Sequence, residues 1–259
     1  MSLAQQLLLK VPVLPLGLLI SLVAGLSALV FLVLVWRFAP REIWKRHNDV
    51  TNAIFQAIAM AYTVLLAFVV VISWQNYDKA RDHIEREANS LVDLYVNAGG
   101  LAPAFQDSFD ALIRDYVKRV IDEEWKLLAR SQESVKAREA LAKLWDLYRS
   151  YEPVTEKEKA FFADSIVRLT DVREARRLRI VDSKSSVHPL LWFLLIIGGI
   201  LTMGFSLILG ADSFHLHLLM TSLLAIFIAL ILFMILMFDY PFTGSFGIGP
   251  DAYRRVLGI

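Results

Sequence analysis

Three polar side chains lie within the second of four long apolar segments, at spacings that place them on one face of a helix. Asn52, Gln56 and Thr63 are separated by four and seven residues, and both intervals return to the same helical face. Amide and hydroxyl groups on such a face can replace part of the water around an ion that crosses a membrane. They can equally hydrogen-bond a neighbouring helix. The spacing therefore leaves two interpretations open, pore lining and helix packing.

An acidic residue closes the last apolar segment. Asp239 is followed by Tyr-Pro-Phe-Thr-Gly at 240–244, a stretch suited to ending a helix and turning the chain. The helix dipole disfavours a carboxylate at a helix C-terminus, so we expect a positively charged partner. The candidates are Lys79, Arg81 and the arginines of 173–179. We interpret Asp239 as a structural latch, and a gating or ion-selecting acid is the alternative.

Four arginines lie shortly before the third apolar segment, namely Arg173, Arg176, Arg177 and Arg179. Basic side chains next to a membrane attract anionic lipid headgroups, at about 1 kcal/mol each near the surface. They can also draw small anions toward a pore. We therefore predict that this run meets lipid or anions. Acidic residues interleaved with it argue against nucleic acid as a partner.

A small set of residues has the chemistry of metal ligands but only a weak arrangement for it. His47, Asp49, Asp212 and His215 offer imidazole and carboxylate groups that suit Zn²⁺ or a hard cation. Asn48 or Asp49 more simply caps the N-terminus of the helix that follows. We therefore predict no metal site and no cofactor.

The chain carries none of the usual signatures of an enzyme. It has no cysteine, which excludes disulfides, thiolate nucleophiles and cysteine-based metal sites. It also lacks a Gly-rich phosphate loop, a His-Glu-x-x-His zinc motif and a nucleophile elbow. We predict that the protein is not an enzyme.

The elements that must position these residues are membrane helices. The four apolar segments are 16–36, 50–74, 189–209 and 216–238. A hydrocarbon core of about 30 Å needs about 20 helical residues, and only helices satisfy the backbone of single segments within lipid. The overall composition agrees, with 56% hydrophobic residues and a mean hydropathy of +0.51. We predict an all-α integral membrane protein with two pairs of transmembrane helices, in the lipid bilayer.

Between the two pairs lies a polar region that we expect to form a soluble helical bundle. The predicted division is 1–75 for the first pair, 76–187 for the soluble domain, and 188–259 for the second pair with a C-terminal tail. Neither Pro nor Gly occurs from Val50 to Ala98, so the second membrane helix should continue into the soluble domain. Its apolar seam there includes Tyr77, Ile84 and Leu91, at a seven-residue spacing typical of helix packing.

The remainder of the soluble domain is also predicted to be helical. Gly99 and Gly100 should end the long helix. Further helices are expected from Pro103 to about 130, over about 134–150, and from Thr155. Glu158 follows Thr155 by three residues, which is the spacing of a capping box. No segment shows the alternating pattern of a strand.

The distribution of Lys and Arg favours a cytoplasmic soluble domain. Basic residues are more numerous on the side of 76–187 than in the loop after the first segment, and the loop after the third segment has none. By the positive-inside rule, the soluble domain and both termini lie on the cytoplasmic side of a bacterial inner membrane.

Several segments together resemble a bacterial membrane family described as bestrophin-like. They are 47–49 (HND), 67–71 (AFVVV), 74–77 (WQNY), 85–95 (EREANSLVDLY), 124–125 (EW), 190–192 (LLW) and 239–244 (DYPFTG). Where such families commonly have Arg between the Asp and Pro-Phe, this chain has Tyr240. The resemblance implies a multi-span membrane protein and, through bestrophins, an oligomeric anion channel. This is an analogy at the level of the fold.

Two functional hypotheses follow. The first is a homo-oligomeric channel for small ions, with the second transmembrane helix lining the pore and its extension forming a helical vestibule. The second is a non-conducting membrane anchor whose heptad face, from Tyr77 to Tyr95, serves assembly with a partner. The first requires several copies around an axis, whereas the second does not.

Overall fold

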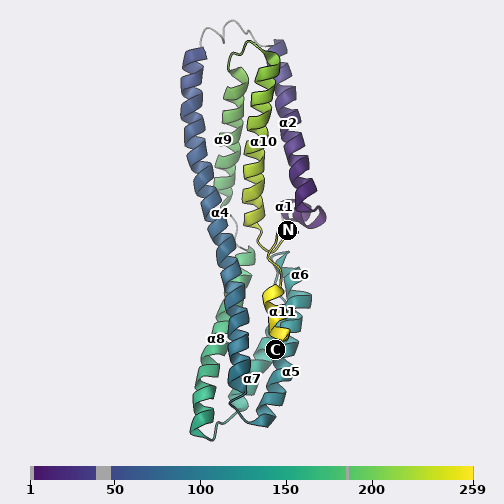
Figure 1. Cartoon of the computed structure of the whole chain (residues 1–259), viewed down its shortest axis with the longest axis vertical. Coiled ribbons are helices and arrows are strands. Elements are labelled where there is room, and N and C mark those ends of the chain that lie inside the picture. The colour runs from purple at the N-terminus through teal and green to yellow at the C-terminus, as the bar shows by residue number, and fades with distance from the viewer. Residues whose placement is uncertain (1–2, 39–47, 185–186, 259) are drawn as a thin grey trace. The chain divides into compact units, whose positions relative to one another are not determined.

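The computed structural model describes residues 3–38, 48–184 and 187–258. Its regular elements in these ranges are helices: α1 Leu3–Lys10, α2 Val13–Phe38, α4 Asn48–Ala98, α5 Pro103–Arg119, the π-helix η1 Val120–Glu124, α6 Trp125–Leu128, α7 Val135–Ser150, α8 Glu156–Lys184, α9 Pro189–Ile208, α10 Phe214–Asp239 and α11 Asp251–Leu257 (Figure 1). No strand occurs in the described ranges. The prediction of an all-α fold is confirmed.

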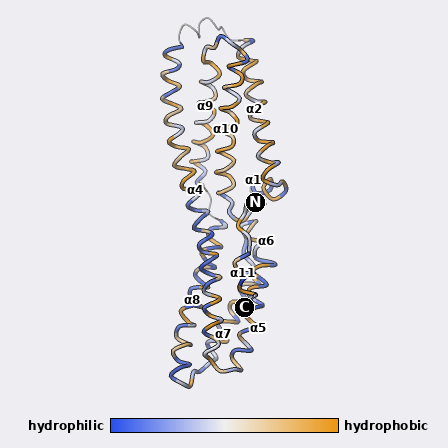
Figure 2. Tube along the Cα trace, viewed as in Figure 1, coloured by the Kyte–Doolittle hydropathy of each residue, from blue (hydrophilic) through white to orange (hydrophobic). Residues whose placement is uncertain are grey.

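Four helical segments are long and apolar enough to cross a membrane: α2, the first part of α4, α9 together with the helix before it, and α10. Figure 2 shows hydrophobic residues along α2, α9 and α10, and a change from hydrophobic to hydrophilic along α4. The prediction of four membrane-spanning helices is therefore confirmed. The long helix was also predicted correctly, because α4 runs without a break over 51 residues.

The chain divides into two compact units that differ from the predicted domains at both chain ends. The membrane unit comprises Lys10–Gln75 and Ser186–Asp239, and the soluble unit comprises Met1–Leu9, Asn76–Ser185 and Tyr240–Ile259. The N-terminal segment and the C-terminal tail thus belong with the middle region. The division predicted from the sequence groups them with the transmembrane pairs instead.

In the membrane unit, α2 packs along α10 through small residues. A Cβ atom added at Gly17 would lie 3.2 Å from the ring of Phe233, and one at Gly25 would lie 3.4 Å from Ile226. Small residues let transmembrane helices approach closely, and van der Waals packing then supplies much of the association energy.

Polar contacts tie the ends of the membrane helices together. The Asn48 amide donates to the backbone oxygen of Gly210 at 3.2 Å and accepts from the Gly210 N–H at 3.0 Å, which joins the start of α4 to the turn after α9. Trp36 of α2 donates its indole N–H to Nδ1 of His217 on α10. The other ring nitrogen of His217 therefore donates to the backbone oxygen of Ser206 on α9, at 2.9 Å.

In the soluble unit, the second part of α4 lies antiparallel to α8. Polar pairs follow the two helices in opposite sequence order: His83–Asp182 at 2.6 Å, Glu87–Arg179 at 2.9 Å, Asp93–Arg168 at 3.6 Å and Asn97–Asp164 at 2.6 Å. At the far end the predicted stop at Gly99 and Gly100 is found. A Cβ atom at Gly100 would lie 2.3 Å from the Phe161 ring, so this turn needs a residue without a side chain.

The other helices predicted for the soluble unit are found in the predicted order, with one difference. Within the helix predicted from Pro103 to about 130, a π-helical turn, η1, separates α5 from α6. The capping box is confirmed, since the Glu158 N–H donates to Thr155 Oγ1 at 3.1 Å and Glu158 accepts from the Thr155 N–H at 3.3 Å. Helix α11, which was not predicted, packs on α5 with Tyr253 fully buried.

Candidate functional site

One face of α4 in the membrane unit is buried against the other helices. Tyr62, Leu66 and Val69 belong to an apolar cluster that also contains Leu195 of α9 and Ile235 of α10. These α4 positions recur at intervals of four and three residues, as a packed helical face requires. The face fixes how α4 is rotated about its own axis within the membrane unit.

Tyr62 packs closely against α9. A Cβ atom at Gly198 would lie 2.4 Å from the Tyr62 ring, and one at Gly199 would lie 3.1 Å from its hydroxyl oxygen. Two adjacent glycines thus leave room for the tyrosine ring against the α9 backbone. A larger side chain at Gly198 would force Tyr62, and α4 with it, to move.

The polar stripe lies outside this buried face. Asn52, Gln56 and Thr63 are all exposed in the single chain. Thr63 follows Tyr62 by one residue, so its side chain leaves the helix about 100° away from the buried tyrosine. The Thr63 hydroxyl donates to the backbone oxygen of Ala59 on its own helix, at 2.8 Å. Among the described residues the stripe is therefore not used for packing within the subunit.

The heptad face of α4 in the soluble unit is used internally. Ile84 is 2% exposed and Leu91 is fully buried, and both belong to the main apolar core of that unit together with Leu144 of α7. Ile84 and Leu91 therefore pack against helices of their own chain and are not free to bind a separate partner.

Asp239 does not have the positive partner that we predicted. Its carboxylate accepts from the Val187 N–H and, at 3.3 Å, from the indole N–H of Trp192, and it is 7% exposed. No ion pair with Lys79, Arg81 or the arginines of 173–179 is found among the described residues. Two neutral donors, one just before α9 and one near its start, satisfy the carboxylate instead. Asp239 thus joins the end of α10 to the beginning of α9.

The prediction of four arginines facing lipid or anions is wrong for two of them. Arg176 is 6% exposed and Arg179 is fully buried, whereas Arg173 and Arg177 are exposed. Arg177 pairs with Glu174 at 2.6 Å on its own helix. Helix periodicity explains the division, because α8 turns residues 176 and 179 toward the core formed by Leu169 and Val172.

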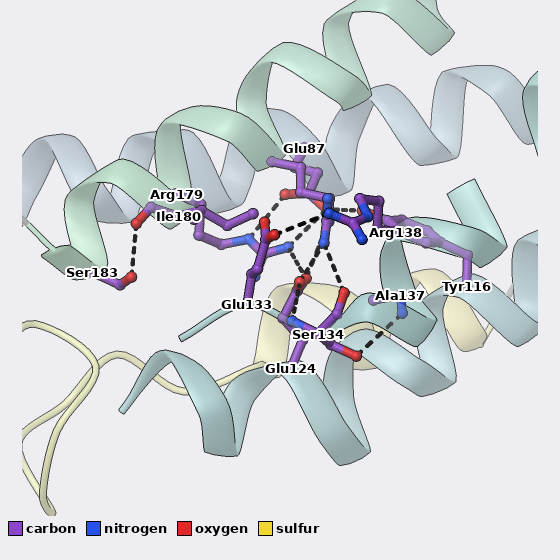
Figure 3. A network of polar contacts seen from close by, with 11 residues as sticks. Glu87, Tyr116, Glu124, Glu133, Ser134, Ala137, Arg138, Arg179, Ile180 and Ser183 are labelled. Atoms are coloured by element: carbon purple, nitrogen blue, oxygen red, sulfur yellow. Dashed lines mark hydrogen bonds and ion pairs between the residues drawn. The ribbon is translucent and has the colours of Figure 1, made fainter. Parts of the chain in front are cut away.

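The buried arginines form an ionic network with two glutamates that were not among the predicted site residues (Figure 3). Arg179 donates through Nε to Glu87 at 2.9 Å and through Nη2 to Glu124 at 3.0 Å. Arg176 donates to the same Glu124 and, at 3.3 Å, to the Ser134 backbone oxygen. Both glutamates are fully buried. Two carboxylates thus face two guanidinium groups, and the network is electrically balanced.

Aromatic and polar groups complete the network. The Tyr116 hydroxyl donates to Glu87 at 2.6 Å, and the Arg179 guanidinium lies 5.4 Å from the ring centres of Trp125 and Tyr253. Burial and the charge of Glu87 raise the pKa of Tyr116 well above its usual value, so the phenol remains a donor. Burial alone would raise the pKa of Glu124, but the guanidinium groups of Arg179 and Arg176 outweigh it and lower that pKa.

The weak metal candidates do not come together within the described residues. His47 lies outside these residues. No group of three or more His, Asp or Glu side chains in the described ranges could hold a metal ion. Asn48, which with Asp49 was one of two candidates for a helix cap, exchanges hydrogen bonds with the Gly210 backbone.

Comparisons with known proteins identify related sequences and structures. A family model described as Bestrophin-like domain matches residues 22–253. No curated protein matches the sequence. The fold is similar to crystal structures of variants of a bacterial bestrophin homologue from Klebsiella pneumoniae. One has a TM-score of 0.69 at 12% identity, covering 95% of this chain and 97% of that one, and another has 0.63 at 14% identity, covering 93% and 99%.

A third similar structure is a variant described as a membrane protein. It has a TM-score of 0.67 at 12% identity, with 93% of this chain and 97% of that chain covered. At these identities the similarity concerns the fold. It extends over nearly the whole chain in each case, so both units take part in it.

Proposed function

The chain belongs to the Bestrophin-like family, and on this premise we propose that it is a homo-oligomeric membrane ion channel, rather than an enzyme, in which α4 lines the pore. The family match and the fold support a membrane ion channel at the level of the family. We propose in addition that several copies assemble, that α4 lines the pore and that the pore selects anions.

The observation that carries the proposal is the position of the polar stripe. Asn52, Gln56 and Thr63 are exposed on a helix that is long and apolar enough to cross a membrane. Polar side chains in contact with lipid tails are unfavourable. A water-filled path between several copies of α4 would give these groups a polar environment.

The chemistry of the stripe is compatible with anions. Asn52 and Gln56 can direct amide N–H groups toward a passing anion. The stripe contains no carboxylate that would repel one. In this arrangement the soluble units form a vestibule on the cytoplasmic side of a bacterial inner membrane.

Ion flux through liposomes tests the proposal. Purified protein in liposomes should pass chloride, and the reversal potential across a salt gradient in planar bilayers should lie toward that of chloride. Gln56→Leu and Thr63→Leu should lower the conductance, because they remove polar groups from the path. Ile54→Leu is the matched control, since residue 54 is exposed about 160° around α4 from residue 56. Liposomes that remain impermeable would contradict the channel.

A further inference from the structure

An acidic cluster covers one side of the α4–α8 pair in the soluble unit. Arg168 lies 3.6 Å from the carboxylates of Asp93 and Asp164 and 3.8 Å from that of Asp171. The four side chains are between 37% and 51% exposed. Three carboxylates share one guanidinium, so two negative charges are in excess. The neighbouring Val167 is 54% exposed, which adds an apolar element to this surface.

A groove of about 400 Å³ lies on the other side of α8, between α8 and α7. Leu141, Trp145 and Ile180 supply its apolar lining, and Arg138, Arg173 and Arg177 supply its exposed charges. We call it the arginine groove.

The arginine groove has an excess positive charge. Arg138 pairs with Glu133 at 3.2 Å and Arg177 pairs with Glu174 at 2.6 Å. The Arg173 guanidinium lies over the Trp145 ring at 5.4 Å, and no ion pair is found for it among the described residues. One positive charge therefore stands beside an exposed apolar surface.

The two surfaces point in opposite directions from the same helix. Asp164 and Arg173 are nine residues apart, which is two and a half turns at about 3.6 residues per turn. An acidic face and a basic face on opposite sides of one element are suited to a head-to-tail contact between identical chains. Such heterologous contacts form a ring when the rotation between copies closes.

We propose that the acidic cluster of one copy packs onto the arginine groove of the next copy. This rests on the proposed homo-oligomeric channel and adds the surfaces that join its soluble units. Arg173 meets the carboxylates around Arg168, and Val167 covers apolar surface next to Trp145. Apolar contact around the aromatic ring supplies affinity, and the complementary charges set orientation and register.

Disulfide cross-linking tests the contact directly, because the chain has no cysteine of its own. A variant with both Val167→Cys and Arg177→Cys carries one thiol beside each surface. These positions are ten residues apart, about 15 Å along α8, which is too far for a disulfide within one chain. Mild oxidation should give a ladder of covalent multimers on a non-reducing gel. The two single variants should give no species larger than a dimer.

Charge reversal provides a second measurement. Arg173→Glu and Asp171→Arg should each cause loss of the oligomer in detergent, and their combination should restore it. Molar mass is measured by size-exclusion chromatography with light scattering, and circular dichroism confirms folding of each variant. Arg149→Glu, at an exposed position on α7, is the control and should leave the oligomer intact.

The outcomes separate this contact from the channel itself. If the unmodified protein is an oligomer that conducts ions, but the double-cysteine variant forms no ladder and charge reversal has no effect, the contact is wrong and the channel stands. If the unmodified protein is a monomer that passes no ions, both proposals are wrong.

Discussion

The ring of Tyr62 lies directly against the α9 backbone at Gly198, where an added Cβ atom would approach the ring to 2.4 Å. This contact sets the rotation of α4 and with it the direction of the exposed stripe that contains Gln56 and Thr63. The arrangement of the proposed pore therefore depends on a glycine in a different helix from the one that lines it.

Gly198→Ala should destabilise the membrane unit and lower ion conductance together. The new methyl group would displace the Tyr62 ring, and overpacking of this kind typically costs about 1–3 kcal/mol. Thermal unfolding in detergent and ion flux in liposomes measure the two effects. Gly204→Ala on the same helix is the control, because no atom lies within 4 Å of its added Cβ. Equal melting temperatures for the two variants would contradict the role of the Tyr62 contact.

The buried network of the soluble unit should be sensitive to the loss of a single member. Arg179→Met would leave Glu87 buried without its guanidinium partner, and removal of one partner of a buried pair costs about 3–5 kcal/mol. Arg177→Met, at an exposed position of the same helix, should change stability by less than about 1 kcal/mol. Chemical denaturation of the purified protein measures both variants. A small effect of Arg179→Met would mean that the network contributes little to stability.

The same network should make the protein sensitive to acid. Arg179 and Arg176 lower the pKa of Glu124 in the folded state against the effect of burial. The folded protein therefore releases this proton more readily than the unfolded chain, where a glutamate has a pKa of about 4.3. The resulting stabilisation is present above that value and is lost as the pH falls through the lower, folded pKa.

Unfolding temperatures measured from neutral pH down to about pH 3, below the reference pKa of glutamate, test this expectation. The unmodified protein should lose stability in the acidic part of the series. Glu124→Gln should be less stable at neutral pH and should show a weaker dependence on pH. An unchanged slope in that variant would show that other carboxylates dominate acid unfolding.

Much of the helical framework could be predicted from the sequence because its determinants are local. The absence of Pro and Gly between Val50 and Ala98 predicted the continuous α4, and Thr155 with Glu158 predicted the start of α8. Each of these features depends on residues that are close together in the chain. Local preferences of this kind are found in the folded protein when tertiary contacts favour the same conformation.

The ionic network could not be assembled from the sequence because its partners are distant. Arg179 is separated from Glu87 by 92 residues and from Glu124 by 55. A signal was nevertheless present. Glu87 lies on the apolar stripe of Ile84 and Leu91, where a charged residue requires a buried partner. Opposite charges on the apolar faces of different helices would have indicated pairs inside the core.

For Asp239, the sequence predicted a positively charged partner, but the structure has neutral N–H donors. The helix dipole argument called for a cation, yet the N–H groups of Val187 and Trp192 satisfy the carboxylate. A charged group can be stabilised by neutral donors when their hydrogen bonds are well placed. Nothing in the sequence indicated that a residue just before α9 and one within it would supply such donors.

Asp239→Ala should therefore loosen the connection between α10 and α9. The substitution leaves the Val187 N–H and the Trp192 indole N–H without their acceptor, and each unsatisfied buried group costs about 1–3 kcal/mol. Asp239→Asn keeps one acceptor oxygen and should lose less stability. Thermal unfolding of both variants in detergent gives the ranking, and Trp192 fluorescence shows whether the indole environment changes. If Asp239→Asn is as unstable as Asp239→Ala, the negative charge contributes more to stability than the two hydrogen bonds.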